Sequence, residues 1–135
     1  MNITTKGRYA LRIMLDLAQQ ENGAVTSLKS ISQRQGISMK YLEAIAAVLN
    51  RADYITSTRG KNGGYRLTRK PEEYSIGELL KLTEGSLAPV SCLESGCPNS
   101  VGCLTLPLWA GLDRRIDDYL GKVTLGDVLN GTVPK

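Results

Sequence analysis

One stretch of this chain, residues 28–67, restricts the possible folds more than any other part of the sequence. Apolar residues at helical spacing predict one helix before Gly36 and a second helix over 39–50. Gly36 suits the turn between them because glycine tolerates a positive φ, and Ser38 is a preferred residue for capping the second helix. Two helices joined by so tight a turn form a helix-turn-helix unit. The predicted buried stripe of the second helix consists of Leu42, Ile45, Ala46 and Leu49.

Two short segments of alternating polarity follow, at 54–58 and 64–68, and predict a pair of antiparallel strands. The loop between them, Arg59-Gly60-Lys61-Asn62-Gly63-Gly64, is basic and rich in glycine. A helix-turn-helix followed by a basic hairpin is the order of a winged helix-turn-helix. On duplex DNA, a helix can enter the major groove and a thin basic loop can enter the minor groove.

The residues that the second helix exposes near its start are the first candidate DNA contacts. Lys40 can reach a phosphate or a guanine, and Tyr41 can contact a phosphate or a thymine methyl group. Glu43 can accept a hydrogen bond from cytosine and would repel phosphates at a wrong sequence. The alternative is that these are ordinary polar residues on a solvated helix face, and without the hairpin that interpretation would be preferred. The predicted contact set of this helix is Ser38, Lys40, Tyr41 and Glu43.

The hairpin loop supplies the second set of candidates. An arginine at a loop tip fits the narrow, negative minor groove of A·T-rich DNA, which favours Arg59 as the strongest candidate. Lys61 can contact a further phosphate, and the glycines would let the backbone approach the sugar–phosphate wall. The alternative is a flexible hairpin whose charge is incidental. The predicted contact set of the loop is Arg59, Gly60, Lys61, Asn62 and Gly63.

The charge distribution favours a nucleic-acid partner for the front half of the chain. Residues 1–70 carry 12 Lys and Arg against 4 Asp and Glu, a net charge of +8, whereas residues 71–135 carry 5 against 9, a net charge of −4. The hydrophobic fraction of 41% is enough for a core. No apolar run approaches the roughly 20 residues of a membrane helix. Since the N-terminus does not resemble a signal peptide, we expect a cytoplasmic protein with no membrane partner.

The whole sequence predicts a mostly α fold with a small β wing, in three regions. These are a winged helix-turn-helix domain over 1–83, a connector and cysteine-containing loop over 84–104, and a long helix with a short final helix over 105–135. Ser75 and Thr124 each open a capping-box pattern, and Pro107 is tolerated in the first turn of the long helix. The apolar stripe of the long helix has little core of its own to meet and consists of Leu108, Leu112, Ile116, Tyr119 and Val123.

Three cysteines, Cys92, Cys97 and Cys103, lie within twelve residues of the predicted loop. Their spacing is not that of a zinc finger, and a cytoplasmic chain does not suggest a disulfide framework. Three thiolates on one loop suit a soft metal or an iron–sulfur cluster completed by a non-cysteine ligand. Free thiols or a thiol redox sensor are the alternatives. A catalytic cysteine would need a base, and the chain contains no histidine, so we expect no enzyme activity.

Several motifs resemble those of the Rrf2-type winged-helix transcription regulators, and the resemblance covers nearly the whole chain. They are TTKGRYA at 4–10, GISMKYLEAI at 36–45, STRGKNGGYRL at 57–67, CLTLPLW at 103–109 and TLGDVLNG at 124–131. The chain looks most similar to the IscR-like, iron–sulfur members of that family. TSLKSI at 26–31 and the connector at 87–90 add some CymR-like features.

The resemblance implies a homodimer in which the stripe of the long helix, from Leu108 to Val123, crosses its partner. It also implies a pseudo-palindromic operator in double-stranded DNA, with the residues of the second helix in the major groove and Arg59 in the minor groove. In IscR-like members the three cysteines bind a [2Fe–2S] cluster, which we expect here in preference to [4Fe–4S]. The fourth ligand is not identified, because Leu106 stands where IscR-like members have histidine and Arg8 stands where some relatives have an acidic ligand.

The leading hypothesis is a homodimeric transcription regulator whose operator binding is controlled by an iron–sulfur cluster at Cys92, Cys97 and Cys103. The cluster would order the loop beside the start of the long helix and so set the contact available to Glu43. One alternative is a CymR-like repressor of cysteine and sulfur metabolism, controlled by a cysteine-biosynthetic enzyme as partner or by thiol redox state. A further alternative, from a different class, is an iron–sulfur enzyme or carrier.

Overall fold

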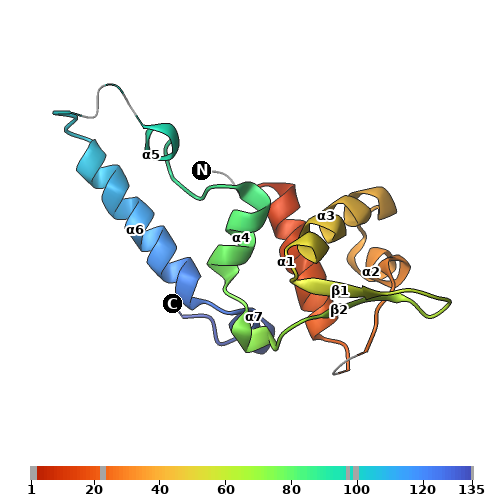
Figure 1. Cartoon of the computed structure of the whole chain (residues 1–135). Coiled ribbons are helices and arrows are strands. Elements are labelled where there is room, and N and C mark those ends of the chain that lie inside the picture. The colour runs from red at the N-terminus through yellow and green to blue at the C-terminus, as the bar shows by residue number, and fades with distance from the viewer. Residues whose placement is uncertain (1–2, 22–23, 97, 99–100, 135) are drawn as a thin grey trace.

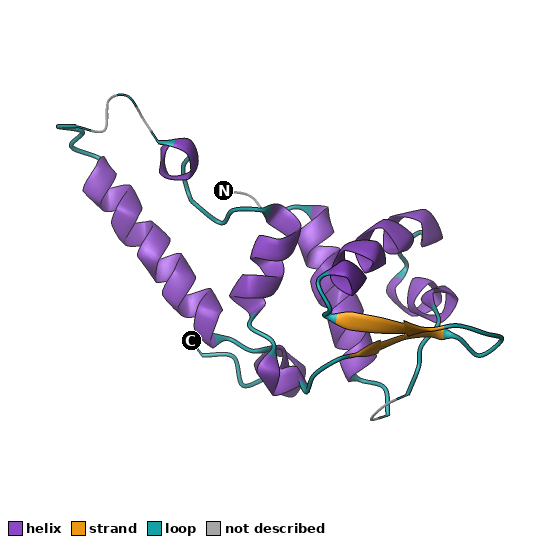
Figure 2. Cartoon of the chain, viewed as in Figure 1, coloured by secondary structure: helices purple, strands orange, loops and turns teal. Residues whose placement is uncertain are grey.

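A computed structural model of the chain describes residues 3–21, 24–96, 98 and 101–134. Figures 1 and 2 show a winged helical body from which one long helix, α6, extends to the side. The predicted class, mostly α with a small β wing, is confirmed. In chain order the elements are α1 (Thr5–Ala18), α2 (Leu28–Gln35), α3 (Met39–Arg51), β1 (Ile55–Thr58), β2 (Gly64–Leu67), the 3-10 helix η1 (Pro71–Glu73), α4 (Ile76–Glu84), α5 (Cys92–Ser95), α6 (Leu106–Lys122) and α7 (Leu125–Asn130).

The turn between α2 and α3 has the predicted local chemistry. Gly36 ends α2 in the left-handed conformation, with φ of 66° and ψ of 33°, which glycine adopts without a steric penalty. The Ser38 hydroxyl accepts a hydrogen bond from the Tyr41 N–H at 3.3 Å and caps α3. The residues predicted to be the inner stripe of α3 are buried, namely Leu42, Ile45, Ala46 and Leu49. These local signals therefore fix how α3 emerges from the turn.

The core lies where α1 packs against α3 and α4. Its fully buried side chains include Ile13 and Met14 of α1, Leu42 of α3 and Leu79 of α4. Burying each of these side chains contributes on the order of 1.5–3 kcal/mol of hydrophobic stabilisation. The packing of α1 against α3 and α4 therefore stabilises the helix-turn-helix unit. Within the described residues, no helix is long and apolar enough to cross a membrane.

The wing is a two-stranded antiparallel hairpin in which Ile55 pairs with Leu67 and Thr58 pairs with Gly64. Thr26 pairs with Tyr65 from the outside of β2, through two backbone hydrogen bonds of 2.8 Å. The buried Tyr74 closes the base of the hairpin, since its hydroxyl donates to the Tyr54 carbonyl at 2.7 Å. The wing is thus attached to the body at its base and along β2.

The cysteine-containing segment differs from the prediction in one respect. The segment was expected to be a loop throughout, but residues Cys92–Ser95 form the one-turn helix α5. A single turn of four residues is too short to produce a detectable hydrophobic period. Figure 1 shows α5 between the end of α4 and the start of α6.

The expectation that the stripe of α6 has no core of its own is wrong at its C-terminal end. Val123 lies just after the helix, is buried in the core, and accepts a hydrogen bond from the Ile76 N–H at 2.9 Å. Ile116 also packs against the core. Gly77 makes this approach possible, because a Cβ at that position would lie 3.1–3.2 Å from the backbone of Leu120 and Gly121. The C-terminal part of α6 is therefore tied to α4 of the same chain.

Candidate nucleic-acid interface and cysteine segment

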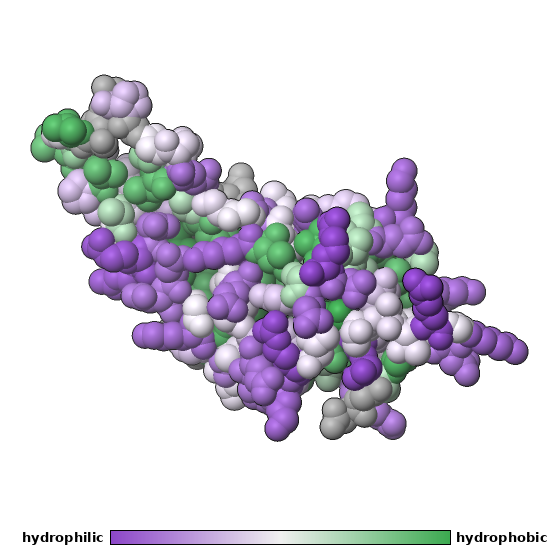
Figure 3. Space-filling model, in the orientation of Figure 1, coloured by the Kyte–Doolittle hydropathy of each residue, from purple (hydrophilic) through white to green (hydrophobic). Residues whose placement is uncertain are grey.

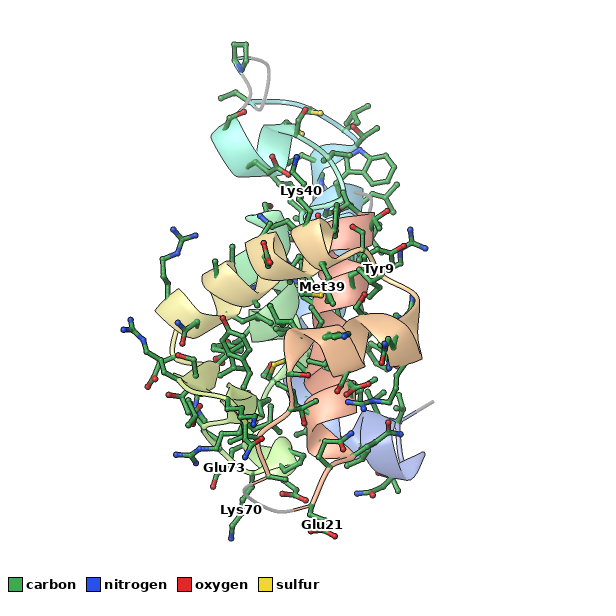
Figure 4. The ribbon with its side chains drawn as sticks, turned by 90° about the vertical axis from the view of Figure 1, so that its right-hand side faces the viewer. Tyr9, Glu21, Met39, Lys40, Lys70 and Glu73 are labelled. Carbon is green, nitrogen blue, oxygen red and sulfur yellow. The ribbon has the colours of Figure 1, made fainter. Side chains whose placement is uncertain are left out.

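All four residues predicted to contact DNA from α3 are exposed: Ser38, Lys40, Tyr41 and Glu43. Tyr41 does not project freely, because its ring makes an edge-to-face contact with Tyr9 of α1 at a centroid distance of 5.4 Å. Figure 4 shows Tyr9, Met39 and Lys40 close together near the middle of the view. Glu21, Lys70 and Glu73, which line an open pocket of ≈ 610 Å³ at the base of the wing, lie at the lower end of the same view.

A buried carboxylate holds α2 against α1. Asp16 is 2% exposed and accepts hydrogen bonds from the Arg34 guanidinium at 2.7 and 3.0 Å and from the Gln35 amide at 2.9 Å. Burial alone raises the pKa of Asp16, but the hydrogen bonds from Arg34 and Gln35 and the charge of Arg34 outweigh it, so the pKa lies below its ordinary value. Asp16 is therefore ionised at neutral pH and fixes the end of α2.

Arg12 continues this network toward α3. Its guanidinium donates to the Gln35 side-chain oxygen at 3.1 Å and also to the Gln35 carbonyl, and it lies 5.3 Å from the centre of the Tyr9 ring. The residues that orient α3, the helix with the predicted DNA contacts, thus come largely from α1. Sequence reasoning missed Tyr9, Arg12 and Asp16, because a helical pattern does not show which helix a polar residue will meet.

The wing loop presents its predicted contacts to solvent. Arg59, Gly60, Lys61 and Asn62 are exposed, and Figure 1 shows the hairpin extending beyond the body. The Gly63 N–H donates to the Gly60 carbonyl at 3.0 Å and closes the loop. A Cβ on Gly63 would collide with the Thr58 carbonyl, so this glycine has a role in the turn itself.

A polar groove of ≈ 370 Å³ joins the wing to the helix-turn-helix unit. Lys61, Asn62 and Gly63 line one side, and Ser27, Ser30 and Arg34 of the α2 region line the other. The wing and α2 therefore form one continuous polar surface. Sequence reasoning missed the contribution of α2, since the pairing of Thr26 with Tyr65, which brings the two elements together, joins residues that are far apart in the sequence.

Two of the three cysteines can be placed. Cys92 begins α5, Cys103 lies shortly before α6, and both are partly exposed free thiols. Cys97 lies outside the described residues, and among those that are described no three potential ligands come together. The Cys103 sulfur lies 3.4 Å from the Thr105 hydroxyl, and hydrogen bonds from Thr105 and the Leu106 N–H lower the pKa of the Cys103 thiol.

A lowered pKa gives a testable reactivity. At neutral pH we expect a larger fraction of Cys103 to be thiolate in the metal-free protein than is usual for a cysteine. Thr105→Val should reduce this fraction. Iodoacetamide labelling followed by peptide mass spectrometry measures the rate at Cys103 in both proteins. Ser95→Ala, which removes a hydroxyl that donates to the Ser91 carbonyl elsewhere in the segment, is the matched control. Equal rates in the wild type and Thr105→Val would contradict the assigned hydrogen bond.

The N-terminal half of α6 exposes apolar side chains. Leu108 is 62% exposed and Leu112 is 41% exposed, and Leu104 lies almost fully exposed just before the helix. Figure 3 shows hydrophobic surface gathered at the end of the molecule where α6 begins. Large exposed apolar patches of this kind mark interaction sites.

The Rrf2 family model, described as an iron-dependent transcriptional regulator, matches residues 3–131 of this chain. The chain belongs to the Rrf2 family. Protein rrf2 of Nitratidesulfovibrio vulgaris is 41% identical over 131 residues, which are 96% of this chain and 87% of that relative. The regulator IscR of Aliivibrio salmonicida is 39% identical over 130 residues, 96% of this chain and 77% of that relative.

The solved structures that are similar to this Rrf2 chain include regulators of two types. CymR, the global cysteine regulator of B. subtilis, is 36% identical, with a TM-score of 0.83 and coverage of 98% of both chains. T. potens IscR is 37% identical, with a TM-score of 0.78 and coverage of 97% of this chain and 88% of that chain. The chain is therefore a transcription regulator, as its sequence predicted, and not an enzyme. Transcription regulators of this family bind DNA.

Proposed function

We propose that this Rrf2-family regulator binds a pseudo-palindromic operator as a homodimer, and that an iron–sulfur cluster on Cys92, Cys97 and Cys103 controls this binding. The observation that carries the proposal is the place of the cysteine segment in the chain. It connects the winged body, which exposes Lys40 and Arg59, to the exposed apolar half of α6. A change in this segment can therefore alter how two winged bodies are held relative to each other.

The DNA contacts follow from what the two elements expose. Lys40, Tyr41 and Glu43 lie near the start of α3, the part of a reading helix that meets base edges in the major groove. Arg59 and Lys61 extend on the wing toward the adjacent minor groove and the phosphates. Ser27 and Ser30 in the groove beside the wing are further candidates for phosphate contact.

Dimerisation through α6 is supported by its exposed apolar residues. Leu108, Leu112 and Tyr119 remain exposed on the single chain, and a second copy of α6 would bury them. Val123 is buried in its own chain and Ile116 is partly buried against the same core, so these two residues offer less surface to a second copy than Leu108, Leu112 and Tyr119 do. A dimer would also place two reading helices on one face of the duplex, as a pseudo-palindrome requires.

The donor set fits an iron–sulfur cluster. Three cysteines lie within twelve residues of the sequence, Cys92 and Cys103 are partly exposed, and the pKa of the Cys103 thiol is lowered, which favours the thiolate that metals bind. A bound cluster would join the cysteines of this segment to one another, and this link would depend on the supply of iron and on the redox state. We propose [2Fe–2S] in preference to [4Fe–4S], with a fourth ligand that is not a histidine of this chain.

Anaerobic purification tests the cluster. We expect a coloured protein that contains iron and acid-labile sulfide, and we expect Cys92→Ser, Cys97→Ser and Cys103→Ser each to remove the colour and change the affinity for operator DNA. Ser91→Ala serves as a control within the same segment. A colourless protein that cannot be reconstituted, with cysteine variants that bind DNA as the wild type does, would refute cluster control.

Control by thiol oxidation is the second candidate, because one similar structure is the oxidized form of Staphylococcus aureus CymR, with a TM-score of 0.75 and 36% identity. In that case the aerobically purified, iron-free protein would lose operator binding on treatment with peroxide and regain it with dithiothreitol. A reversible loss of operator binding in the iron-free protein would favour thiol oxidation, whereas a coloured, iron-containing protein from the anaerobic preparation would favour the cluster. The comparisons do not support a cysteine-biosynthetic enzyme as partner.

The wing gives a direct prediction for DNA binding. Arg59→Ala is expected to weaken specific operator binding by about 1–3 kcal/mol, because an arginine inserted in the minor groove is lost. Fluorescence anisotropy with a labelled operator duplex, over a range of salt concentrations, measures the change. Lys122→Ala removes the same charge from the exposed end of α6 and is expected to have little effect. Equal affinities for the wild type and Arg59→Ala would remove Arg59 from the interface.

A further inference from the structure

The start of α1 is capped by a residue from a distant part of the chain. The Thr4 side chain makes no capping hydrogen bond to the helix, and the first turn of α1 contains no acidic residue. The Glu84 carboxylate instead accepts hydrogen bonds from the N–H groups of Thr4 and Gly7, both at 3.0 Å, and from the Thr4 hydroxyl at 2.7 Å. A carboxylate is favourable here because it meets unpaired N–H groups and the positive end of the helix dipole.

Gly7 provides the space for this contact. A Cβ at Gly7 would collide with Oε1 of Glu84, so a larger residue would push the carboxylate away. Gly7 is buried and lies inside a helix, where glycine is otherwise unfavourable relative to alanine. Its presence is explained by the approach of Glu84.

The same end of α1 contacts the reading helix. Tyr9 lies two residues after Gly7 and makes the edge-to-face contact with Tyr41 of α3. Arg12, on the next turn of α1, lies over the Tyr9 ring and holds Gln35 at the end of α2. The position of the first turns of α1 therefore determines where the Tyr41 ring can lie.

Glu84 also marks the beginning of the cysteine-containing region. It is the last residue of α4, and Gly85, with φ of 85°, turns the chain toward α5 and Cys92. The contact of Glu84 with Thr4 and Gly7 thus joins the root of this segment to the start of α1.

We propose that Glu84 is a positioning residue for the DNA-reading helix: its carboxylate fixes the start of α1, and α1 in turn holds Tyr41 through Tyr9. This inference rests on the proposed contact of Tyr41 with DNA. It assigns to Glu84 an influence on operator recognition although Glu84 itself lies outside the proposed interface. Movement of the cysteine-containing region would reach Tyr41 by the same route.

A double-mutant cycle tests the proposal, with a duplex selected by the wild-type protein from random DNA as the probe. Glu84→Ala is expected to reduce the ratio of specific to non-specific affinity by roughly fivefold, a size typical of coupling through packed side chains. Glu84→Gln, which keeps an acceptor oxygen, should restore part of the loss. Asp127→Ala is the matched control, because Asp127 also caps a helix, α7, and also carries one negative charge.

The cycle is completed by combining Glu84→Ala with Tyr9→Leu. If the effect passes through Tyr9, Glu84→Ala should reduce the ratio little further in the Tyr9→Leu background. Additive losses, or an equal loss in Asp127→Ala, would overturn the proposal.

Amide hydrogen exchange provides a readout that needs no DNA. Glu84→Ala should accelerate exchange at Gly7 and at Leu42, whose N–H donates to the Ser38 carbonyl in the first turn of α3. Acceleration at Gly7 without acceleration at Leu42 would overturn the proposal. A wild-type protein with no specific DNA binding would instead refute the proposed function, and the exchange result would still decide the role of Glu84.

Discussion

Replacing Asp16 with alanine is expected to lower the free energy of unfolding by about 2 kcal/mol. Asp16 is buried, and the substitution removes its hydrogen bonds from Arg34 and Gln35 at once. The loss should be smaller than for a fully buried ion pair, because the Arg34 side chain is 43% exposed and water can solvate it. Urea unfolding followed by circular dichroism measures the change.

The stabilisation by Asp16 should depend on pH in a defined direction. Its folded-state pKa is lowered, so its contribution is fully present above the pKa of the unfolded carboxyl, which is about 3.9. The contribution is lost as the pH falls from there through the lower folded-state pKa. The difference in stability between the wild type and Asp16→Ala should therefore be constant near neutral pH and shrink below about pH 4.

An exposed ion pair on the same molecule provides the control. Asp117 lies 3.0 Å from Lys81, but both side chains are nearly half exposed. Asp117→Ala is expected to cost less than about 0.5 kcal/mol, since exposed pairs contribute little. Equal losses for Asp16→Ala and Asp117→Ala would show that Asp16 does not clamp α2 to α1.

The features that could be predicted from the sequence are those set by neighbouring residues. Ser38 and Thr124 cap helices through hydrogen bonds that reach only three residues along the chain. Gly36 has the left-handed conformation that the turn required, and the inner face of α3 follows from apolar spacing alone. The exposure of Lys40 and Glu43 is the other side of that pattern.

The features that the sequence did not reveal are contacts between distant residues. Glu84 contacts Thr4 and Gly7 from 77 to 80 residues away, and nothing in the local pattern of either segment indicates the other. Val123 continues the apolar step of the α6 stripe, yet the helix ends at Lys122 and the chain turns Val123 into the core. A period of apolar residues identifies a buried face but not the element that buries it.

Gly64 illustrates the same lesson in the wing. The sequence predicts that this glycine lets the backbone approach DNA. In the structure, Gly64 instead lies against the backbone of Thr26 and Ser27 of the same chain. A Cβ at Gly64 would collide with the Thr26 carbonyl and lie 2.7 Å from the Ser27 nitrogen. These are backbone atoms just before α2, and backbone cannot move aside as a flexible side chain can.

Gly64→Ala is therefore expected to destabilise the protein by about 2 kcal/mol, the usual cost of overpacking a close contact. It should also weaken operator binding, because the strand pairing of Thr26 with Tyr65 sets the distance between the wing and α2. With the wing displaced, Arg59 and the reading helix could no longer reach their grooves together. Urea unfolding measures the first effect, and anisotropy with an operator duplex under conditions where the variant is folded measures the second.

Gly121→Ala is the matched substitution for Gly64→Ala. A Cβ at Gly121 meets no atom within 4 Å, and this glycine lies in α6, where alanine is the better helix former. Gly121→Ala should leave stability unchanged or raise it by up to about 1 kcal/mol. If Gly64→Ala were as stable as the wild type and bound DNA equally well, β2 could not lie against Thr26, and the wing would have to present Arg59 by another route.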